Sequence, residues 1–371
     1  MKGVVTTVPK KRVGEEIKAL TGVRAFAALW VLSLHYNQAF PVAPLDGWFA
    51  FVCRGHIGVD IFFVLSGYIL AYVYYDRLRF FSPQDCKIFL FLRLARIYPA
   101  YLVGLLATVG LFVVATMIFS YEFNAPGNWR LSHLPFQITL TQAWGFDEIS
   151  LWNVPSWSVS SEWLAYLTMP LLLPMVLRGR ELLWLVMVVL LVTAIVVVYG
   201  YSGLDVATSF KGWRAVFRVL SEFWLGVLLF ALIGRSSFSS ALGEAAVIVA
   251  LGGFFLLPYF AFGDIWLLLL CPLLITGLHK ANGVASRIFS STPMVYVGKA
   301  SYSVYIMHFP VQLVLVQLYA RLGVFGSGPM GKSIGLVVAV GTALFAGVLL
   351  FHFVETPCRR ALQERVASVS I

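Results

Sequence analysis

The stretch that most constrains this chain is 21–36, TGVRAFAALWVLSLHY, an apolar run of membrane-spanning character that contains an arginine and a histidine. Ten residues separate Arg24 from His35. On an α-helix the two side chains would lie about three turns apart, about 16 Å along the axis and on nearly the same face. Ionisable side chains inside a membrane usually face a protein interior or a wet cavity. The pair therefore predicts a functional site, although His35 taken alone fits a hydrogen bond between helices equally well.

The composition places this stretch in a membrane protein. Of 371 residues, 60% are hydrophobic and 12% are charged, with a mean hydropathy of +0.86, far outside the range of soluble chains. The net charge of +10 fits basic residues beside membrane spans, and we expect no nucleic-acid partner. The four cysteines are scattered, which predicts neither a disulfide framework nor a metal site.

Apolar runs long enough to cross a membrane occur ten times, so both termini would lie on one side. If that side is the cytoplasm, twenty of the 27 lysines and arginines lie inside and seven outside, as expected for a spanning protein. We therefore predict an all-α polytopic helix bundle in a bacterial cytoplasmic (inner) membrane, with both termini cytoplasmic. The predicted spans are 22–40, 57–76, 99–120, 157–177, 182–200, 213–233, 242–260, 264–280, 298–320 and 333–354.

The spans form a single predicted membrane domain, 22–356, between cytoplasmic tails at 1–21 and 357–371, with no appended soluble domain. The polar start of the chain is followed by no small-residue cleavage site, which predicts an uncleaved signal-anchor helix. The longest extracytoplasmic connection, 121–156, contains LPFQITLTQAW, which is too short and polar to span. We predict a re-entrant or interfacial segment near 129–146.

Two motifs carry charges near helix ends. HIGVDIFFVLSGYIL places Asp60 near the outer end of its helix, where we favour a structural role over orientation of an imidazole. FLRLARIYPAY puts Arg93 and Arg96 one turn apart, just before Tyr98 and Pro99, which we take as the start of the next span. Two guanidiniums so spaced suit phosphate, but they equally suit topology determinants and contacts with anionic lipid.

The motif VPSWSVSSEWLAY places Ser158, Ser161 and Glu162 on one helix face, flanked by Trp157 and Trp163. Tryptophans at a helix start are typical of the membrane interface. Glu162 lies one or two turns into the span and needs a partner or an aqueous cavity. It could orient an acceptor hydroxyl, shuttle a proton or pair with an arginine.

Histidines and a glutamate mark the last two spans. His308 in SYSVYIMHFP is a second intramembrane imidazole, and Glu355 in FHFVETPCRR lies at the last cytoplasmic boundary. No spacing among the histidines resembles a zinc site. The histidines that lie in or near loops or at a helix end need no catalytic explanation: His56, His133, His279 and His352.

Together and in this order, these motifs resemble the acyltransferase-3 family of integral membrane acyltransferases, which modify carbohydrates and other cell-surface or secreted acceptors. The resemblance covers nearly the whole chain. Its most specific element is the arginine, ten residues and histidine of the first span, Arg24 and His35. The other matching motifs are GVDIFFVLSGY, RLARIYP, PSWSVSSEW, YSVYIMHFP and the terminal ETP.

The resemblance implies transfer of an acyl group, usually acetyl, from cytoplasmic acyl-CoA to a hydroxyl of an extracytoplasmic saccharide or glycolipid. It implies that His35 is the catalytic histidine. It also implies that Arg24, Arg93 and Arg96 hold the phosphates of coenzyme A. Acetyl-CoA is thus expected as a donor substrate, and no metal is expected.

The same match places Glu162 and Ser158 with the catalytic groups near the acceptor, and Trp157, Asp60 and His308 with acceptor binding. Membrane lipid is an expected partner, and a homo-oligomer is compatible with the sequence. Some family members continue into a soluble hydrolase-like domain outside the membrane. We find no such domain in this sequence.

The residues agree with this assignment independently of the family. Basic groups at the inner edge and an imidazole deeper on the same face match coenzyme A, which has phosphates at one end and a thioester at the end of a long arm. His35 could deprotonate the acceptor hydroxyl or attack the thioester to form an acyl-histidine. The sequence leaves both routes open.

Two other classes of protein fit the composition. A transporter or flippase of a lipid-linked saccharide would also contain buried ionisable groups, but such proteins commonly show two related halves with broken helices, and we detect neither. A purely structural scaffold leaves Arg24, His35, Glu162 and His308 without a reason. We therefore favour an enzyme.

Overall fold

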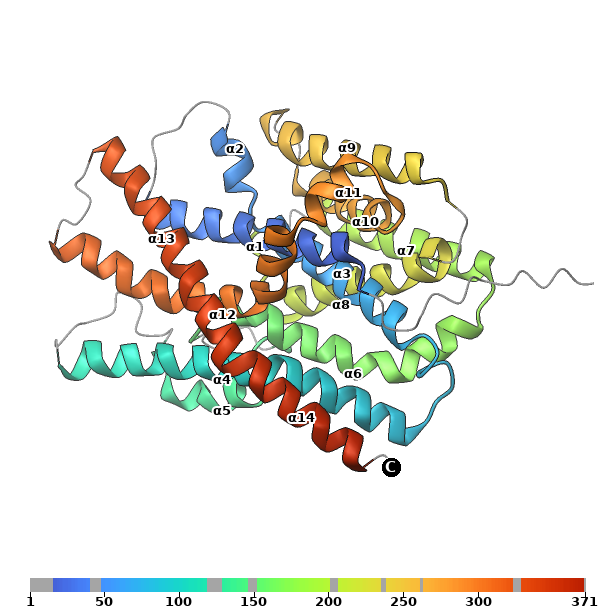
Figure 1. The fold of residues 1–371 in the computed structure, drawn as a ribbon, viewed down its shortest axis with the longest axis horizontal. Coiled ribbons are helices and arrows are strands. Elements are labelled where there is room, and N and C mark those ends of the chain that lie inside the picture. Colours follow the sequence, from blue (N-terminus) through green and yellow to red (C-terminus); the bar gives the residue numbers. More distant parts are fainter. Residues whose placement is uncertain are drawn as a thin grey trace, which may run out of the picture.

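The computed structural model describes residues 16–40, 48–118, 129–145, 152–200, 206–234, 238–260, 263–322 and 328–369. Within these ranges the chain forms helices and short connections and no β-strand (Figure 1). The long helices are α1 Lys18–Ala39, α3 Ile57–Tyr74, α4 Pro83–Met117, α6 Ser156–Arg178, α7 Glu181–Gly200, α8 Gly212–Leu229, α9 Ser240–Leu256, α10 Asp264–Lys280, α12 Thr292–Leu322 and α13 Pro329–Leu350.

Eight helical segments in the described ranges are long and apolar enough to cross a membrane. This finding confirms the predicted all-α polytopic bundle. The two other predicted spans are also helical, in α10 and α12. The count of ten spans and the cytoplasmic placement of both termini stay predictions.

Helix α4 differs from the prediction at its start. We placed the beginning of the span at Tyr98 and Pro99, but the helix begins at Pro83, where Ser82 accepts a hydrogen bond from the backbone N–H of Asp85 at 3.3 Å. Pro99 lies inside the continuous helix. Proline is tolerated within membrane helices because neighbouring groups satisfy the backbone atoms that it frees. Arg93 and Arg96 therefore belong to the same helix as the span that follows them.

Small residues bring the helices at the centre of the bundle close together. A Cβ atom at Gly58 of α3 would lie 2.5 Å from the carbonyl oxygen of Ala27 in α1. A Cβ atom at Gly67 would lie 1.9 Å from the carbonyl oxygen of Phe223 in α8. Both distances are too short for any side chain, so these glycines permit close helix contact. Helix α3 is thus held tightly between α1 and α8 (Figure 1).

The segment predicted to be re-entrant or interfacial does not span. Within 129–145 it forms a 3₁₀ turn, Leu131–His133, and the short helix α5, Leu134–Ile138, below α4 in Figure 1. The hydroxyl of Tyr101 in α4 donates to the carbonyl of Gln137 at 2.7 Å, and Ser160 of α6 donates to the carbonyl of Leu140 at 2.8 Å. These bonds attach the segment to α4 and to the start of α6.

The chain after α13 stays helical. It passes through a π-helical turn, Phe351–Glu355, into α14, Thr356–Val369, which packs on α4. The described part of the predicted C-terminal tail is therefore a helix. The remaining short helices are α2 Trp48–Cys53 and α11 Val284–Phe289.

Candidate active site

Two cavities occupy the centre of the bundle. The first has a volume of about 310 Å³ and is lined by the start of α1, by α3 and α4, and by parts of α6 and α12. We call it the inner cavity, because the predicted topology opens it toward the cytoplasm. Its charged lining residues are Glu16, Arg24, Arg93, Arg96 and Glu162.

Arg24 has an unusual environment in the inner cavity. Its Nε atom is buried without a hydrogen-bond partner, and its guanidinium forms no hydrogen bond or ion pair with any residue in the described ranges. The nearest aromatic contact is the ring of Phe62, 6.0 Å from the guanidinium carbon. Arg24 as a whole is half-buried, and Glu162 lines the same cavity without reaching ion-pair distance. A cation removed from water without a paired anion is costly. The inner cavity thus presents a guanidinium that can bind an added anion.

Arg93 and Arg96, which the sequence leads us to treat alike, have different partners. Arg93 donates to the hydroxyl of Tyr74 at 2.9 Å and lies over its ring, and it pairs with no carboxylate within the described chain. Arg96 forms an ion pair with the buried Glu355, which also accepts a hydrogen bond from Ser303 at 2.6 Å. Of these two arginines, Arg93 therefore has the uncompensated charge.

Glu162 and Ser158 also line the inner cavity. Glu162 accepts a hydrogen bond from Tyr166 at 2.6 Å and forms no ion pair with the residues described, so the predicted alternative of an arginine partner is not found there. Ser158 lies 3.0 Å from the hydroxyl of Tyr305 and donates to the carbonyl of Pro155 at 2.9 Å. Both polar groups face the space that the arginines share.

The second cavity, the outer cavity, has a volume of about 630 Å³. It contains His35 and Trp157 among its lining residues, together with Arg54, His56 and Arg218. The ring of Trp157 lies 5.3 Å from the guanidinium carbon of Arg218. His35 and Trp157, the latter predicted to bind the acceptor, thus line the same cavity, whereas Ser158 faces the inner cavity.

The inner and outer cavities meet at two shared residues, Val59 and Tyr305. Arg24 lines one cavity and His35 the other, as expected for side chains three turns apart on one helix. Trp157 and Ser158, adjacent in sequence, also face opposite cavities. The wall that separates the two spaces is therefore only a few side chains thick.

His35 is oriented by His308, 273 positions later in the chain. Its Nδ1 lies 2.7 Å from Nε2 of His308, and Nδ1 of His308 contacts the backbone carbonyl of Tyr305. Because a carbonyl oxygen only accepts hydrogen bonds, Nδ1 of His308 carries a proton. Nε2 of a neutral His308 then accepts a hydrogen bond from the Nδ1–H group of His35. This assignment leaves the lone pair of His35 on Nε2, which has no hydrogen-bond partner in the described ranges.

His308 does not take part in lining either cavity. It is fully buried beside His35, with ring centroids 4.9 Å apart. The structure therefore places it behind the imidazole that lines the outer cavity. Its predicted contact with the acceptor has no support in this geometry, and its position suits a positioning role.

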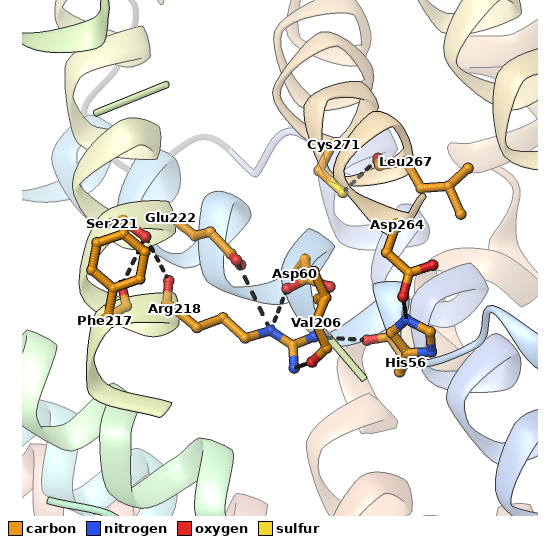
Figure 2. A network of polar contacts seen from close by, with 10 residues as sticks. All are labelled: His56, Asp60, Val206, Phe217, Arg218, Ser221, Glu222, Asp264, Leu267 and Cys271. Atoms are coloured by element: carbon orange, nitrogen blue, oxygen red, sulfur yellow. Dashed lines mark hydrogen bonds and ion pairs between the residues drawn. The ribbon is translucent and has the colours of Figure 1, made fainter. Parts of the chain in front are cut away.

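Asp60 is fully buried and binds Arg218 through both carboxylate oxygens, at 2.7 and 2.8 Å (Figure 2). Glu222, one turn after Arg218 on α8, lies 4.0 Å from the same guanidinium. Asp60 lines neither cavity. This geometry matches the structural role that we favoured, and orientation of an imidazole is not observed.

A second charged cluster lies beside the first. His56 Nε2 is 2.7 Å from one carboxylate oxygen of Asp264 (Figure 2). Arg54 binds the other oxygen. Asp264 is the first residue of α10. His56 is the residue immediately before α3. Within the described ranges, no group of three or more histidine, cysteine, aspartate or glutamate side chains is placed to hold a metal ion.

Sequence comparison identifies the family. A family model described as an acyltransferase domain matches residues 17–353. The chain belongs to this acyltransferase family. The match covers the lining residues of both cavities except Glu16, and every motif of the resemblance except the terminal ETP at 355–357.

Named relatives agree with the family match. The acyltransferase MdmB of Streptomyces mycarofaciens is 30% identical over 94% of this chain and 93% of its own length. The O-acetyltransferase OatA of Staphylococcus aureus is 24% identical over 93% of this chain, but the match spans 57% of that protein. A peptidoglycan O-acetyltransferase OatA of Listeria monocytogenes is likewise 24% identical, over 56% of its length. No solved structure gave a significant match.

Sequence reasoning about this acyltransferase missed Arg218, Asp264, His56 and Tyr305. Arg218 and Glu222 stand four residues apart within a predicted span, and this intramembrane charge pair was an available signal. Asp264 begins an apolar run and resembles an ordinary helix start. Tyr305 belongs to the YSVYIMHFP motif, but nothing local indicates that it separates two cavities.

Proposed function

We propose that this membrane acyltransferase moves an acetyl group from cytoplasmic acetyl-CoA to a hydroxyl of a saccharide or glycolipid outside a bacterial cytoplasmic membrane. One observation carries the proposal: two guanidiniums without carboxylate partners line one cavity, and an oriented imidazole lines the adjoining one. Coenzyme A has anionic phosphates at one end and a neutral thioester at the other. The two cavities match these two ends.

The phosphates would bind Arg24 and Arg93 in the inner cavity. Guanidinium forks bind phosphate oxygens through paired charge-assisted hydrogen bonds. Arg96, already paired with Glu355, would contribute less directly, by holding the wall of the cavity. The pantetheine arm would then extend past Ser158 toward Tyr305 and Val59, where the two cavities meet.

The free lone pair on Nε2 of His35 serves either chemical route. As a general base it takes the proton of the acceptor hydroxyl while the hydroxyl oxygen attacks the thioester carbon, and the C–S bond breaks. As a nucleophile it attacks the thioester itself, and the sulfur leaves as thiolate. In both routes His308 accepts a hydrogen bond from Nδ1 and so stabilises the positive charge that develops on His35.

The names of the relatives support the reaction class. Two of them are O-acetyltransferases, and one is named for peptidoglycan, a saccharide polymer. MdmB, matched over nearly its full length, carries only the general name acyltransferase. We extend acetyl transfer and a saccharide acceptor to this chain as a proposal.

The direct test uses purified full-length protein in lipid nanodiscs with acetyl-CoA labelled in the acetyl group. We expect saturable donor binding and transfer of label to a glycoside acceptor. Free phosphate-containing competitors such as 3′,5′-ADP should displace the donor, because they carry the end that the arginines would bind. Absence of donor binding by the wild-type protein would overturn the proposal.

A further inference from the structure

In the acyl-histidine route, His35 cannot take the proton that the acceptor hydroxyl must lose. Once Nε2 carries the acyl group, Nδ1 is already donating to His308, so neither ring nitrogen can take the proton of the incoming hydroxyl. An alcohol is a weak nucleophile unless a base removes its proton as it attacks. The outer cavity must then supply a second base.

His56 meets the geometric requirements for that base. It lines the same cavity as His35. Its side chain is 13% exposed, whereas that of Asp264 is 4% exposed. His56 is therefore the member of the pair that faces the cavity, with Asp264 behind it.

Asp264 determines which nitrogen of His56 is free. An ionised carboxylate only accepts hydrogen bonds, so Nε2 of His56, 2.7 Å from Asp264, carries the proton. The lone pair of the neutral ring then lies on Nδ1, which has no hydrogen-bond partner in the described chain. Arg54 binds the second oxygen of Asp264, and Arg218 donates to the backbone carbonyl of His56 at 3.3 Å. His56 is thus held in place through both its imidazole and its backbone carbonyl.

We infer that His56, oriented by Asp264, is the base that activates the acceptor hydroxyl, and that His35 carries the acyl group between the two substrates. This inference rests on the proposed function. It assigns a role to a histidine for which the sequence offers no catalytic explanation. Asp264 acts as a positioning residue, since it lines neither cavity and contacts the reacting groups only through His56.

The two half-reactions balance as follows. In the first, Nε2 of His35 attacks the thioester carbon, the C–S bond breaks, and the sulfur leaves as thiolate into the arginine-lined cavity. In the second, the acceptor oxygen attacks the acyl carbon of the acyl-imidazolium while Nδ1 of His56 takes the hydroxyl proton. The C–N bond breaks, its electron pair returns to Nε2 of His35, and His56 later loses its proton to water on the outer side.

The test compares two acceptors that differ in their need for a base. One is the best acceptor in a panel of 4-nitrophenyl glycosides. The other is hydroxylamine, whose neutral nitrogen attacks acyl groups without prior deprotonation. Rates are measured with acetyl-CoA and full-length protein, after subtraction of the rate with His35→Ala, which removes the non-enzymatic reaction of hydroxylamine.

With His56→Gln we expect transfer to the glycoside to fall about 10²–10⁴-fold, the usual contribution of a general base. Transfer to hydroxylamine should stay within about twofold of wild type, and the acetyl label should accumulate on His35 when no acceptor is added. Asp264→Asn should reduce glycoside transfer about tenfold or more with the same sparing of hydroxylamine, since it leaves His56 in place but frees its orientation. His352→Gln, an exposed histidine outside both cavities, is the matched control and should behave as wild type.

The outcomes separate the inference from the function on which it rests. Equal loss with both acceptors would mean that His56 only supports the fold, and an unchanged glycoside rate would remove it from the reaction. Either result overturns the inference while the proposed acetyl transfer stands. Wild-type protein that transfers acetyl to neither acceptor would overturn both.

Discussion

The inner and outer cavities are adjacent, but they differ in whether their lining arginines form ion pairs. In the inner cavity, Arg24 and Arg93 have no carboxylate partner in the described chain. In the outer cavity, both lining arginines are paired: Arg218 with Asp60 and Arg54 with Asp264. The inner cavity therefore has arginines without ion-pair partners, whereas neighbouring carboxylates neutralise the arginines of the outer cavity.

This difference indicates what each cavity is built to receive. Arg24 and Arg93 are half-buried cations without an ion-pair partner in the described chain, and an incoming anion would stabilise them. Internally paired charges need no charged ligand, and they present a fixed polar surface to a neutral one. The contrast fits a phosphate-bearing donor on one side and a neutral hydroxyl acceptor on the other.

The largest effect is expected from His35→Ala. It should reduce transfer to every acceptor below detection, because both chemical routes use Nε2 of His35. Donor binding should persist, since the arginines line the other cavity. Labelled transfer and calorimetric donor binding measure the two effects, with Ser33→Ala on the same helix as control. A wild-type rate in His35→Ala would remove this residue from the chemistry.

The outer charge pair is tested through Asp60→Asn. Leaving the buried Arg218 with only Glu222, 4.0 Å away, as a carboxylate partner in the described chain should destabilise the protein by up to about 3–5 kcal/mol. Thermal unfolding in detergent measures the loss, and the double variant Asp60→Asn with Arg218→Met should recover part of it. If Asp60→Asn were as stable as wild type and bound acceptor poorly, Asp60 would belong to acceptor binding, as the sequence resemblance implies.

The inner arginines are tested by single changes to glutamine. Arg24→Gln and Arg93→Gln should each weaken acetyl-CoA binding about 10–100-fold, as expected for loss of a charge-assisted hydrogen bond. Neither should lower the stability of the donor-free protein, because each removes an unpaired cation.

Arg96→Gln is the matched comparison for these two variants. It leaves the buried Glu355 with only the longer ion pair to Arg359, at 4.0 Å, so its main effect should be on the melting temperature. Should Arg96→Gln instead weaken donor binding most while leaving stability intact, the distinction between paired and unpaired arginines would be wrong.

His308→Gln should have a smaller effect, confined to turnover. Loss of the oriented hydrogen bond to His35 is expected to lower kcat by about tenfold. The affinity for donor should not change, because His308 lines neither cavity. Steady-state kinetics separate the two quantities. A selective rise in the KM for acceptor would instead support the contact with acceptor that the sequence resemblance implies.

Salt should produce the smallest effect and should act on one side only. Donor binding involves charge and should weaken a few-fold between low and high ionic strength. The KM for a neutral glycoside should stay nearly constant, since the outer charges are already paired. Equal salt sensitivity for both substrates would contradict the contrast between the cavities.

The sequence by itself determined the membrane bundle and the placement of Arg24 and His35 on one helix face. These are local properties, because hydropathy and the helical period act over neighbouring residues. The motifs were also sufficient to indicate the family. The sequence did not reveal that α4 begins at Pro83, because Pro99 was taken as the start of the span and the helix continues through it.

Only the tertiary structure decided which charges are paired and which are free. Arg96 meets Glu355 across 259 positions, Asp60 meets Arg218 across 158, and His35 meets His308 across 273. Arg93 and Arg96 look equivalent in sequence, yet a single distant carboxylate neutralises one of them. Which charged side chains pair depends on helix packing, and no local sequence pattern encodes that packing. In this protein the pairing of the arginines is what distinguishes the two cavities.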